Sequence, residues 1–199
     1  LGYPITNTLM GIGCYPATDK QHLGWLGMHG TYEANMAMHH SDLILAVGAR
    51  FDDRVTGLLS AFSPGSKKIH VDIDPSSINK NVSVDVPVVG DAATVLAQML
   101  EVWRRKKYSA DKPALEAWWR QINLWRQRDC LGFRQTGDVI RPQHAIRRLF
   151  EKTAERECFI STEVGQHQMW AAQYYGFDKP NRWLTSGGLG TMGYGLPAA

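Results

Sequence analysis

Short apolar runs alternate with helical patterns along residues 42–107, and this alternation restricts the possible folds more than any other feature. Asp42 to Val47 is apolar after its first residue and is followed by Gly48, as is typical of a strand buried on both faces of a parallel sheet. Lys68 to Ile73 and Val86 to Val89 predict two more strands, and Pro87 places the last one near an edge. Ala92 to Lys107 has apolar residues at helical spacing. The pattern predicts a doubly wound, Rossmann-like α/β domain.

The remaining segments predict further helices and one further strand. Tyr32 to His40 and Ala114 to Arg128 are expected to be helical, and Arg54 to Phe62 forms a short helix or a loop. Pro142 starts a helix that ends near Thr153, and Cys158 to Ser161 forms a strand. The length fits about 1.3 domains, so we expect one domain and part of another. The predicted boundaries are 1–107, a helical linker over 108–141, and 142–199.

Composition and charge exclude several classes of protein. Hydrophobic residues make up 44% and charged residues 21% of the chain, as in a soluble globular protein. No apolar run approaches the roughly 18 residues that span a bilayer. The first residues include neither an initiator methionine nor the basic and then apolar pattern of a signal peptide. We therefore expect an internal segment of a longer soluble protein. The net charge of +3 is small, and its densest cluster, Arg104 to Lys107, fits a helix end better than a nucleic-acid patch.

The cysteines indicate a reducing compartment. Cys14, Cys130 and Cys158 are odd in number and widely spaced, which favours neither a disulfide framework nor a zinc site. We expect a cytoplasmic protein that binds no membrane and no nucleic acid.

A glycine-rich segment close to the end of the chain indicates a ligand site. Five glycines lie between Gly187 and Gly195, with no charged residue among them. Such a backbone can approach a phosphate closely or adopt positive φ values. A flexible linker is the alternative, although Leu189, Met192 and Tyr194 are unusual in linkers.

A second candidate site follows the first predicted strand. Asp72 comes about 24 residues after Gly48 and ends the next strand, which is the spacing at which a carboxylate binds a ribose. The glycine fingerprint of dinucleotide sites is missing, so spacing alone leaves a nucleotide site undecided. Arg50 and Arg54, with their neighbouring aspartates, fit either anion recognition or a surface ion-pair network.

Five motifs in order resemble one enzyme family. They are LGMHGT (26–31), GARFDDRVTG (48–57), HVDID (70–74), VGQHQMWAAQ (164–173) and SGGLGTMGYGLPAA (186–199). Together they resemble the catalytic (large) subunit of acetohydroxyacid synthase, also called acetolactate synthase. The resemblance implies that 1–107 is the C-terminal part of a central FAD-binding domain and 142–199 the N-terminal part of a thiamine diphosphate-binding domain.

What the resemblance implies is a transferase of branched-chain amino acid (isoleucine, valine and leucine) biosynthesis. Such an enzyme decarboxylates pyruvate and joins the two-carbon unit to a second pyruvate or to 2-ketobutyrate, giving 2-acetolactate or 2-aceto-2-hydroxybutyrate. Its cofactors are thiamine diphosphate, Mg²⁺ and FAD, the last in a structural role. Its subunits form a homodimer or homotetramer with a small regulatory subunit, and a bacterial enzyme of this kind is cytoplasmic.

The resemblance also implies site residues. The expected FAD contacts are Thr8, Leu9, Leu26, Gly27, Met28, His29, Gly48, Ala49, Arg50, Phe51, Asp52, Asp72, Ile73, Asp91 and Ala92. The expected thiamine diphosphate contacts are Gln166, His167, Gly190, Thr191 and Met192. Met28, Asp53 and Arg54 line the substrate channel, where Arg54 is a candidate for holding a ketoacid carboxylate. The family's catalytic glutamate and its metal ligands are expected outside the chain, which by itself would be inactive.

Glu163 departs from the family pattern, in which Asp or Gly is more common before Val-Gly-Gln-His-Gln.

Two other interpretations remain. One is another thiamine diphosphate 2-ketoacid enzyme, such as glyoxylate carboligase or pyruvate oxidase, against which Met28, Asp53 and Arg54 argue. The other is a non-catalytic nucleotide-binding module.

Overall fold

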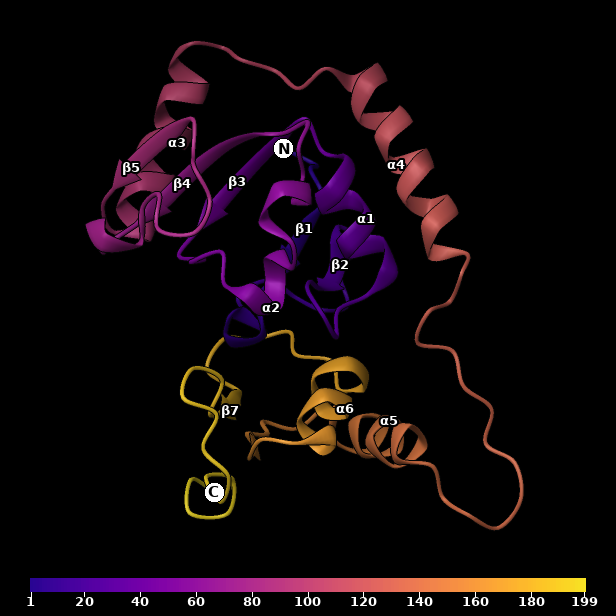
Figure 1. Cartoon of the computed structure of the whole chain (residues 1–199). Coiled ribbons are helices and arrows are strands. Elements are labelled where there is room, and N and C mark those ends of the chain that lie inside the picture. The colour runs from indigo at the N-terminus through magenta and orange to yellow at the C-terminus, as the bar shows by residue number, and fades with distance from the viewer. The chain divides into compact units, whose positions relative to one another are not determined.

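The strands pair in parallel into three small sheets (Figure 1). The chain divides into two units, one of which contains a single sheet and the other two sheets. The structure is a computed structural model that describes residues 1–199. Unit 1 comprises residues 1–3 and 35–125, and unit 2 comprises residues 4–34 and 126–199. All strand pairs are parallel, and helices alternate with the strands along the chain. The predicted α/β class is therefore confirmed.

Unit 1 is built on strands β3 (Leu43–Val47), β4 (Lys67–Asp72) and β5 (Val86–Val89), in the order β3-β4-β5. These are the three strands that the apolar runs predict, shifted by one residue at most. β5 lies at an edge, as Pro87 predicts. Helix α3 (Ala92–Arg105) follows β5.

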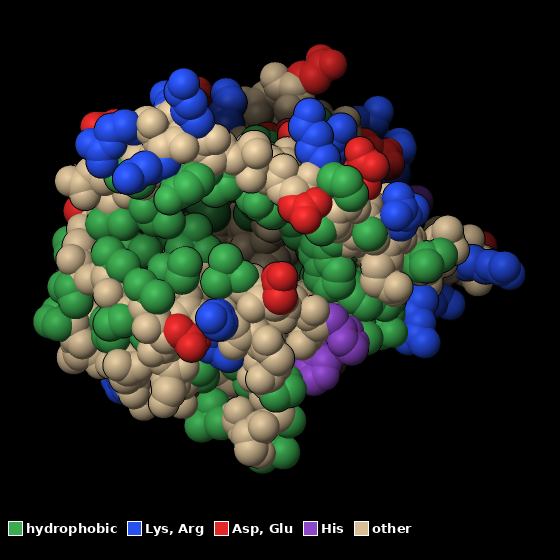
Figure 2. Space-filling view, turned by 90° about the horizontal axis from the view of Figure 1, so that it is seen from above, with side chains coloured by type: hydrophobic (Ala, Val, Ile, Leu, Met, Phe, Trp, Pro, Cys, Tyr) green, Lys and Arg blue, Asp and Glu red, His purple; other side chains and the backbone are tan.

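One prediction about β3 is wrong. Its side chains are not buried on both faces, since Leu43 is 51% and Leu45 43% exposed, whereas Ile44 and Ala46 are buried. Alternate side chains of a strand point to opposite faces of the sheet, and the face that carries Leu43 and Leu45 is not covered by another layer of the structure. Hydrophobic side chains are visible over the left part of Figure 2, where this sheet and α3 lie.

Helices complete unit 1. α1 (Tyr32–His40) has the predicted bounds and passes from unit 2 into unit 1, and α2 (Asp53–Thr56) with the 3-10 turns η2 (Leu59–Ala61) and η3 (Pro75–Ser77) fills the connections. α4 (Lys112–Arg126) begins and ends two residues earlier than predicted. Its Ile122 is fully buried, and its Trp125 stacks on His40 with ring centroids 5.6 Å apart.

Unit 2 contains two strand pairs and two longer helices. β1 (Ile5–Asn7) pairs with β2 (His22–Trp25), and β6 (Ile160–Thr162) pairs with β7 (Trp183–Thr185). The turn η1 (Leu9–Gly11) follows β1, and helices α5 (Pro142–Thr153) and α6 (Gln166–Tyr174) pack on each other. Ala171, Tyr175, Phe177 and Trp183 form the core of this unit.

The predicted last strand is placed too early. It starts at Ile160 and not at Cys158, because the first ladder bond runs from the N–H of Ile160 to the carbonyl of Arg182, at 2.8 Å. Phe159 just before it is 57% exposed. No helix in the structure has the length and apolar character that crossing a membrane requires.

Candidate functional site

The turn after β3 has an uncommon backbone conformation. Gly48 has φ 65° and Phe51 has φ 51°. This left-handed conformation costs a residue that has a side chain about 1–2 kcal/mol. Packing holds Phe51 there, because its ring is buried and meets His70 and Phe62 edge-on at 5.1 and 5.9 Å. Strain of this kind is concentrated in functional turns.

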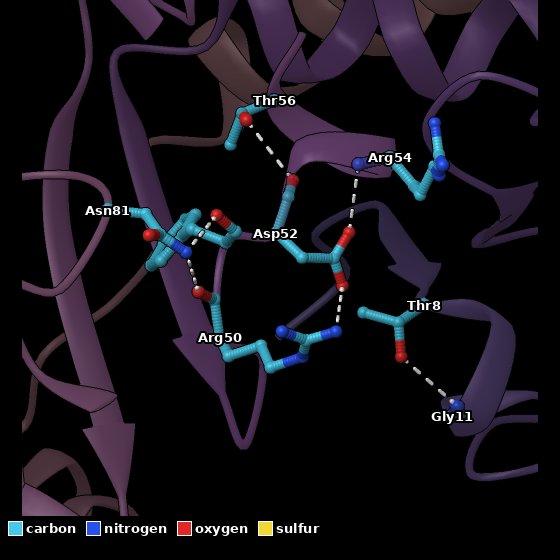
Figure 3. Close-up of polar contacts among 8 residues, drawn as sticks. Thr8, Gly11, Arg50, Asp52, Arg54, Thr56 and Asn81 are labelled. Atoms are coloured by element: carbon cyan, nitrogen blue, oxygen red, sulfur yellow. Dashed lines mark hydrogen bonds and ion pairs between the residues drawn. The ribbon is translucent and has the colours of Figure 1, made fainter. Parts of the chain in front are cut away.

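Polar contacts fix the same turn from both sides (Figure 3). Asp52 caps α2, since its Oδ1 accepts the Arg54 N–H at 3.1 Å, and its Oδ2 lies 3.5 Å from Arg50 Nη2. The Asn81 side chain donates to the carbonyls of Arg50 and Phe51, at 3.3 and 3.0 Å. Asn81 was not predicted. Nothing in the sequence pattern marks it, because it lies some 30 residues away in an irregular segment.

Acidic residues also lie at the carboxyl ends of the next two strands, on the same side of the sheet as this turn. Asp72 ends β4, its Oδ1 accepts the Asp74 N–H at 2.9 Å, and its Oδ2 lies 3.7 Å from His70 Nε2. The Gly48 N–H donates to Val71 O at 2.8 Å, and the Gly90 N–H donates to Asp72 O at 2.9 Å. These bonds tie the ends of the three strands together, at the edge where parallel sheets bind ligands.

Two neighbouring aspartates serve as caps. The hydrogen bond from the Ser76 N–H lowers the pKa of Asp74 most, and the hydrogen bond from the Ser76 hydroxyl lowers it further. The Thr94 N–H, at 2.9 Å, lowers the pKa of Asp91 most, and the Thr94 hydroxyl, at 2.8 Å, adds to the effect. Asp91 thus caps the start of α3, whose first residue is Ala92. Ile73, which follows β4, is 72% exposed.

The predicted FAD contacts of unit 2 follow β1 and β2. The Thr8 hydroxyl accepts the Gly11 N–H at 3.1 Å, also drawn in Figure 3, and Leu9 starts η1. The Leu26 N–H donates to Asn7 O at 3.1 Å, which joins the ends of the two strands. Beyond Gly27, which has φ 102°, Met28 is 62% exposed. The carbonyl of His29 accepts from Gln173 of α6 at 2.9 Å.

The predicted thiamine diphosphate contacts follow β6 and β7. Gln166 and His167 are the exposed first residues of α6, and the first N–H groups of a helix have no partner within it. Gly190 has φ 73°, Thr191 donates its N–H to Ser186 Oγ at 2.8 Å, and Met192 is 78% exposed. Because β6 and β7 are parallel, the segments that follow them leave from one edge of the sheet.

Two further contacts hold the glycine-rich segment. The carboxylate of Glu163 accepts the N–H of Gly193, and the Ser161 hydroxyl donates to Gly195 O at 2.7 Å. A Cβ on Gly195 would lie 2.8 Å from Glu163 N, so only glycine fits there. Glu163 departs from the family pattern, but no role was predicted for it, and Ser161 and Ser186 were not predicted as partners of the glycine-rich segment.

The predicted channel residues belong to both units. Met28 is part of unit 2, whereas Asp53 and Arg54 are the exposed first residues of α2 in unit 1.

A cavity of unit 2 lies apart from the predicted contacts. It measures about 510 Å³, and Asn7, His22, Trp25, Arg147 and Tyr174 are among its lining residues. No predicted cofactor residue lines it. The three cysteines are free thiols, and no three His, Cys, Asp or Glu side chains gather as metal ligands would.

Comparison with known proteins gives two family matches. The family model described as thiamine pyrophosphate enzyme, central domain, matches residues 1–99. The model described as thiamine pyrophosphate enzyme, C-terminal TPP binding domain, matches residues 163–199. Thiamine pyrophosphate is another name for thiamine diphosphate.

Curated relatives match the whole chain. It is 52% identical over 199 residues to the acetolactate synthase isozyme 3 large subunit of Escherichia coli and covers 34% of that protein. It is 51% identical to the acetolactate synthase large subunit of Haemophilus influenzae, again over 34% of that protein. It is 50% identical over 200 residues to the chloroplastic acetolactate synthase of Arabidopsis thaliana and covers 29% of it. The chain thus spans about a third of the length of these relatives.

Proposed function

Because the chain belongs to the thiamine pyrophosphate enzyme family, we propose that it is a segment of an acetolactate synthase catalytic subunit. The parent protein would condense two molecules of pyruvate, or pyruvate and 2-ketobutyrate, with release of CO₂. The products would be 2-acetolactate or 2-aceto-2-hydroxybutyrate. Identity near 50% along the whole chain with large subunits of that name supports this proposal.

The observation that carries the proposal is the pairing of β6 with β7. Because these strands are parallel, α6 and the glycine-rich segment both begin at the carboxyl end of this sheet. The backbone of each has features that suit a diphosphate. Gly165 precedes α6 with φ 154°, and Gly190 and Gly193 have φ 73° and 76°. N–H groups at a helix start and in a glycine turn bind phosphate oxygens. The residues present therefore fit the cofactor.

The predicted binding residues of the two units would have separate tasks. The N–H groups of Gln166 and His167 would bind the diphosphate, and Gly190 to Met192 would hold the pyrimidine. Bound there, thiamine diphosphate supplies the electron sink that decarboxylation of a 2-ketoacid requires. Arg54 would orient the ketoacid by binding its carboxylate, for which a planar guanidinium is well suited. The chain's own part is thus binding and orientation.

We also propose that FAD and Mg²⁺ bind to the parent protein. Asp72 would bind a ribose and the turn at Gly48 to Asp52 a phosphate, which the position of both at the carboxyl ends of the β3-β4-β5 strands supports. Magnesium prefers carboxylate and carbonyl oxygens together with phosphates. As the family resemblance implies, its ligands and the catalytic glutamate would belong to the parent protein outside these residues.

The domain division, assembly and location are further proposals. We retain 1–107, 108–141 and 142–199 as FAD domain, linker and thiamine diphosphate domain, supported by the two family models, which match residues 1–99 and 163–199. Homodimers or homotetramers with a small regulatory subunit agree with the words large subunit in the relatives' names. The free thiols favour a reducing compartment.

The activity assay uses the purified full-length protein with thiamine diphosphate, Mg²⁺ and FAD. Pyruvate is expected to give acetolactate and CO₂ in equal amounts per condensation. A protein that forms no acetolactate would refute the proposal. Condensation of glyoxylate, or formation of acetyl phosphate from pyruvate, phosphate and O₂, would point to the related enzymes instead.

Flavin content tests the second site separately. Asp72→Ala is expected to lower the bound flavin absorbance, since its carboxylate would hold the ribose. Asp74→Ala is the matched control, because this neighbouring carboxylate caps Ser76. Equal flavin retention in both variants would contradict the assignment of Asp72.

A further inference from the structure

Glu163 contacts the glycine-rich segment directly. It follows β6, two residues before the Gly165 that precedes α6, and its carboxylate accepts the N–H of Gly193. The side chain is partly buried, and Gly193 has φ 76°. A Cβ on Gly193 would lie 4.0 Å from the Glu163 carboxylate, and one on Gly195 would lie 2.8 Å from the Glu163 N. The segment therefore lies against the end of β6.

These contacts use N–H donors of a segment that the bound cofactor would contact. Of the segment's N–H groups, that of Thr191 donates to Ser186 and that of Gly193 donates to Glu163. Ser186 is a neutral acceptor, whereas Glu163 carries a negative charge. Incoming thiamine diphosphate would meet an occupied donor in this segment, and the like charge of Glu163 would repel its diphosphate.

We propose that Glu163 is a resident anion of the diphosphate site, and that its carboxylate holds the glycine-rich segment while weakening the affinity for the cofactor. This inference rests on the proposed function, because it concerns the same site. Glu163 is accordingly a positioning and affinity-determining residue. The ligand class is a pyrophosphate group, free or as part of thiamine diphosphate.

The experiment separates charge from hydrogen bonding in the full-length protein. Glu163→Gln keeps an oxygen that accepts the Gly193 N–H but removes the charge, and Glu163→Ala removes both. Glu155→Gln is the matched control, since it removes the same charge from an exposed position in the same unit. Dissociation constants for inorganic pyrophosphate and for thiamine diphosphate are measured by titration calorimetry at fixed Mg²⁺.

We expect Glu163→Gln to bind both ligands about tenfold more tightly, the size of effect that a neighbouring charge commonly has. Glu155→Gln should bind them like the wild type. A purely structural brace predicts unchanged affinity in Glu163→Gln and weaker affinity in Glu163→Ala, and that result would overturn the inference. Tighter pyrophosphate binding in both Glu163 variants supports it.

The outcomes distinguish this inference from the proposed function. If Glu163→Gln binds pyrophosphate more tightly while the parent forms no acetolactate, the inference stands and the proposed activity falls. If the parent makes acetolactate but Glu163→Gln binds pyrophosphate no more tightly, only the inference falls. If the wild type binds neither ligand, both are overturned.

Discussion

The hydroxyl oxygens of Thr162 and Thr185 lie 2.9 Å apart on paired positions of β6 and β7. Gln168 of α6 donates its side-chain N–H to Thr185 Oγ1 at 2.7 Å. All three side chains are buried. This group of hydrogen bonds joins the two strands and the helix from which the proposed cofactor contacts extend.

Thr185→Val is expected to destabilise this part of the protein. It removes the shared hydroxyl and leaves Thr162 and Gln168 buried without that partner, at a cost of about 1–3 kcal/mol. Calorimetry of the full-length protein should show a melting temperature lower by a few degrees. Thr136→Val, the same change at an exposed position, should leave it nearly unchanged. Equal melting temperatures in the two variants would refute the prediction.

His22 is expected to make stability depend on pH. Burial, and to a smaller extent the charge of Arg126, lowers the pKa of His22 below its ordinary 6.5, although the Ala17 carbonyl and two aspartates oppose this. The unfolded chain therefore takes up the proton first as the pH falls below about 6.5. Stability is present above that pH and is lost as the pH falls through the lowered pKa of the folded state.

The measurement is the melting temperature of the full-length protein from pH 7.5 to pH 5. His22→Gln should flatten the decrease over this range, because Gln does not titrate. His39→Gln, at an exposed position, should keep the wild-type slope. If His22→Gln loses stability with falling pH as steeply as the wild type, the prediction fails.

Cys130 is expected to react slowly with alkylating reagents. Burial raises the pKa of its thiol most, and the carboxylate of Glu33, at 3.6 Å, raises it further, whereas the Tyr32 N–H, at 3.2 Å, lowers it. Because the thiolate is the reactive form, Glu33→Gln should accelerate alkylation of Cys130 at pH 8 roughly two- to threefold. Mass spectrometry measures the rate at each cysteine.

Cys14 provides an internal control in the same sample. Burial also raises the pKa of its thiol, and Glu33 is not among the causes. Its rate should be equal in the wild type and in Glu33→Gln. A change at Cys14 with none at Cys130 would contradict the assigned cause.

Local patterns were sufficient for most of the elements. β5, α1 and α5 have the predicted bounds, and β4 is shifted by one residue, because apolar periodicity and Pro142 act within a few neighbouring residues. The two-sided burial of β3 was predicted wrongly because burial of a strand's two faces depends on which segments cover them, and a single apolar run does not contain that information. β6 was misplaced by the same lack of a visible partner.

The motifs located the candidate sites, but their supports come from distant residues. Asn81 reaches the carbonyls near Phe51, and Glu163 reaches Gly193, across some 30 residues each. Such pairs form only after the strands between them have set the register. A motif therefore indicates which residues would meet a ligand, whereas the side chains that hold them in place require the fold.

Gly190 offers the most direct test of the glycine-rich segment. It has φ 73°, and a Cβ there would meet nothing nearer than Val164 Cγ2 at 3.9 Å, so Gly190→Ala changes conformational preference without a clash. The left-handed region costs a non-glycine residue about 1–2 kcal/mol, which corresponds to roughly 5–30-fold weaker binding of thiamine diphosphate. Gly188→Ala is the matched control, since it has open space and no positive φ. Calorimetric titration of the full-length protein should show weaker binding in Gly190→Ala only; equal affinities in the two variants would mean that the cofactor does not depend on the left-handed turn at Gly190.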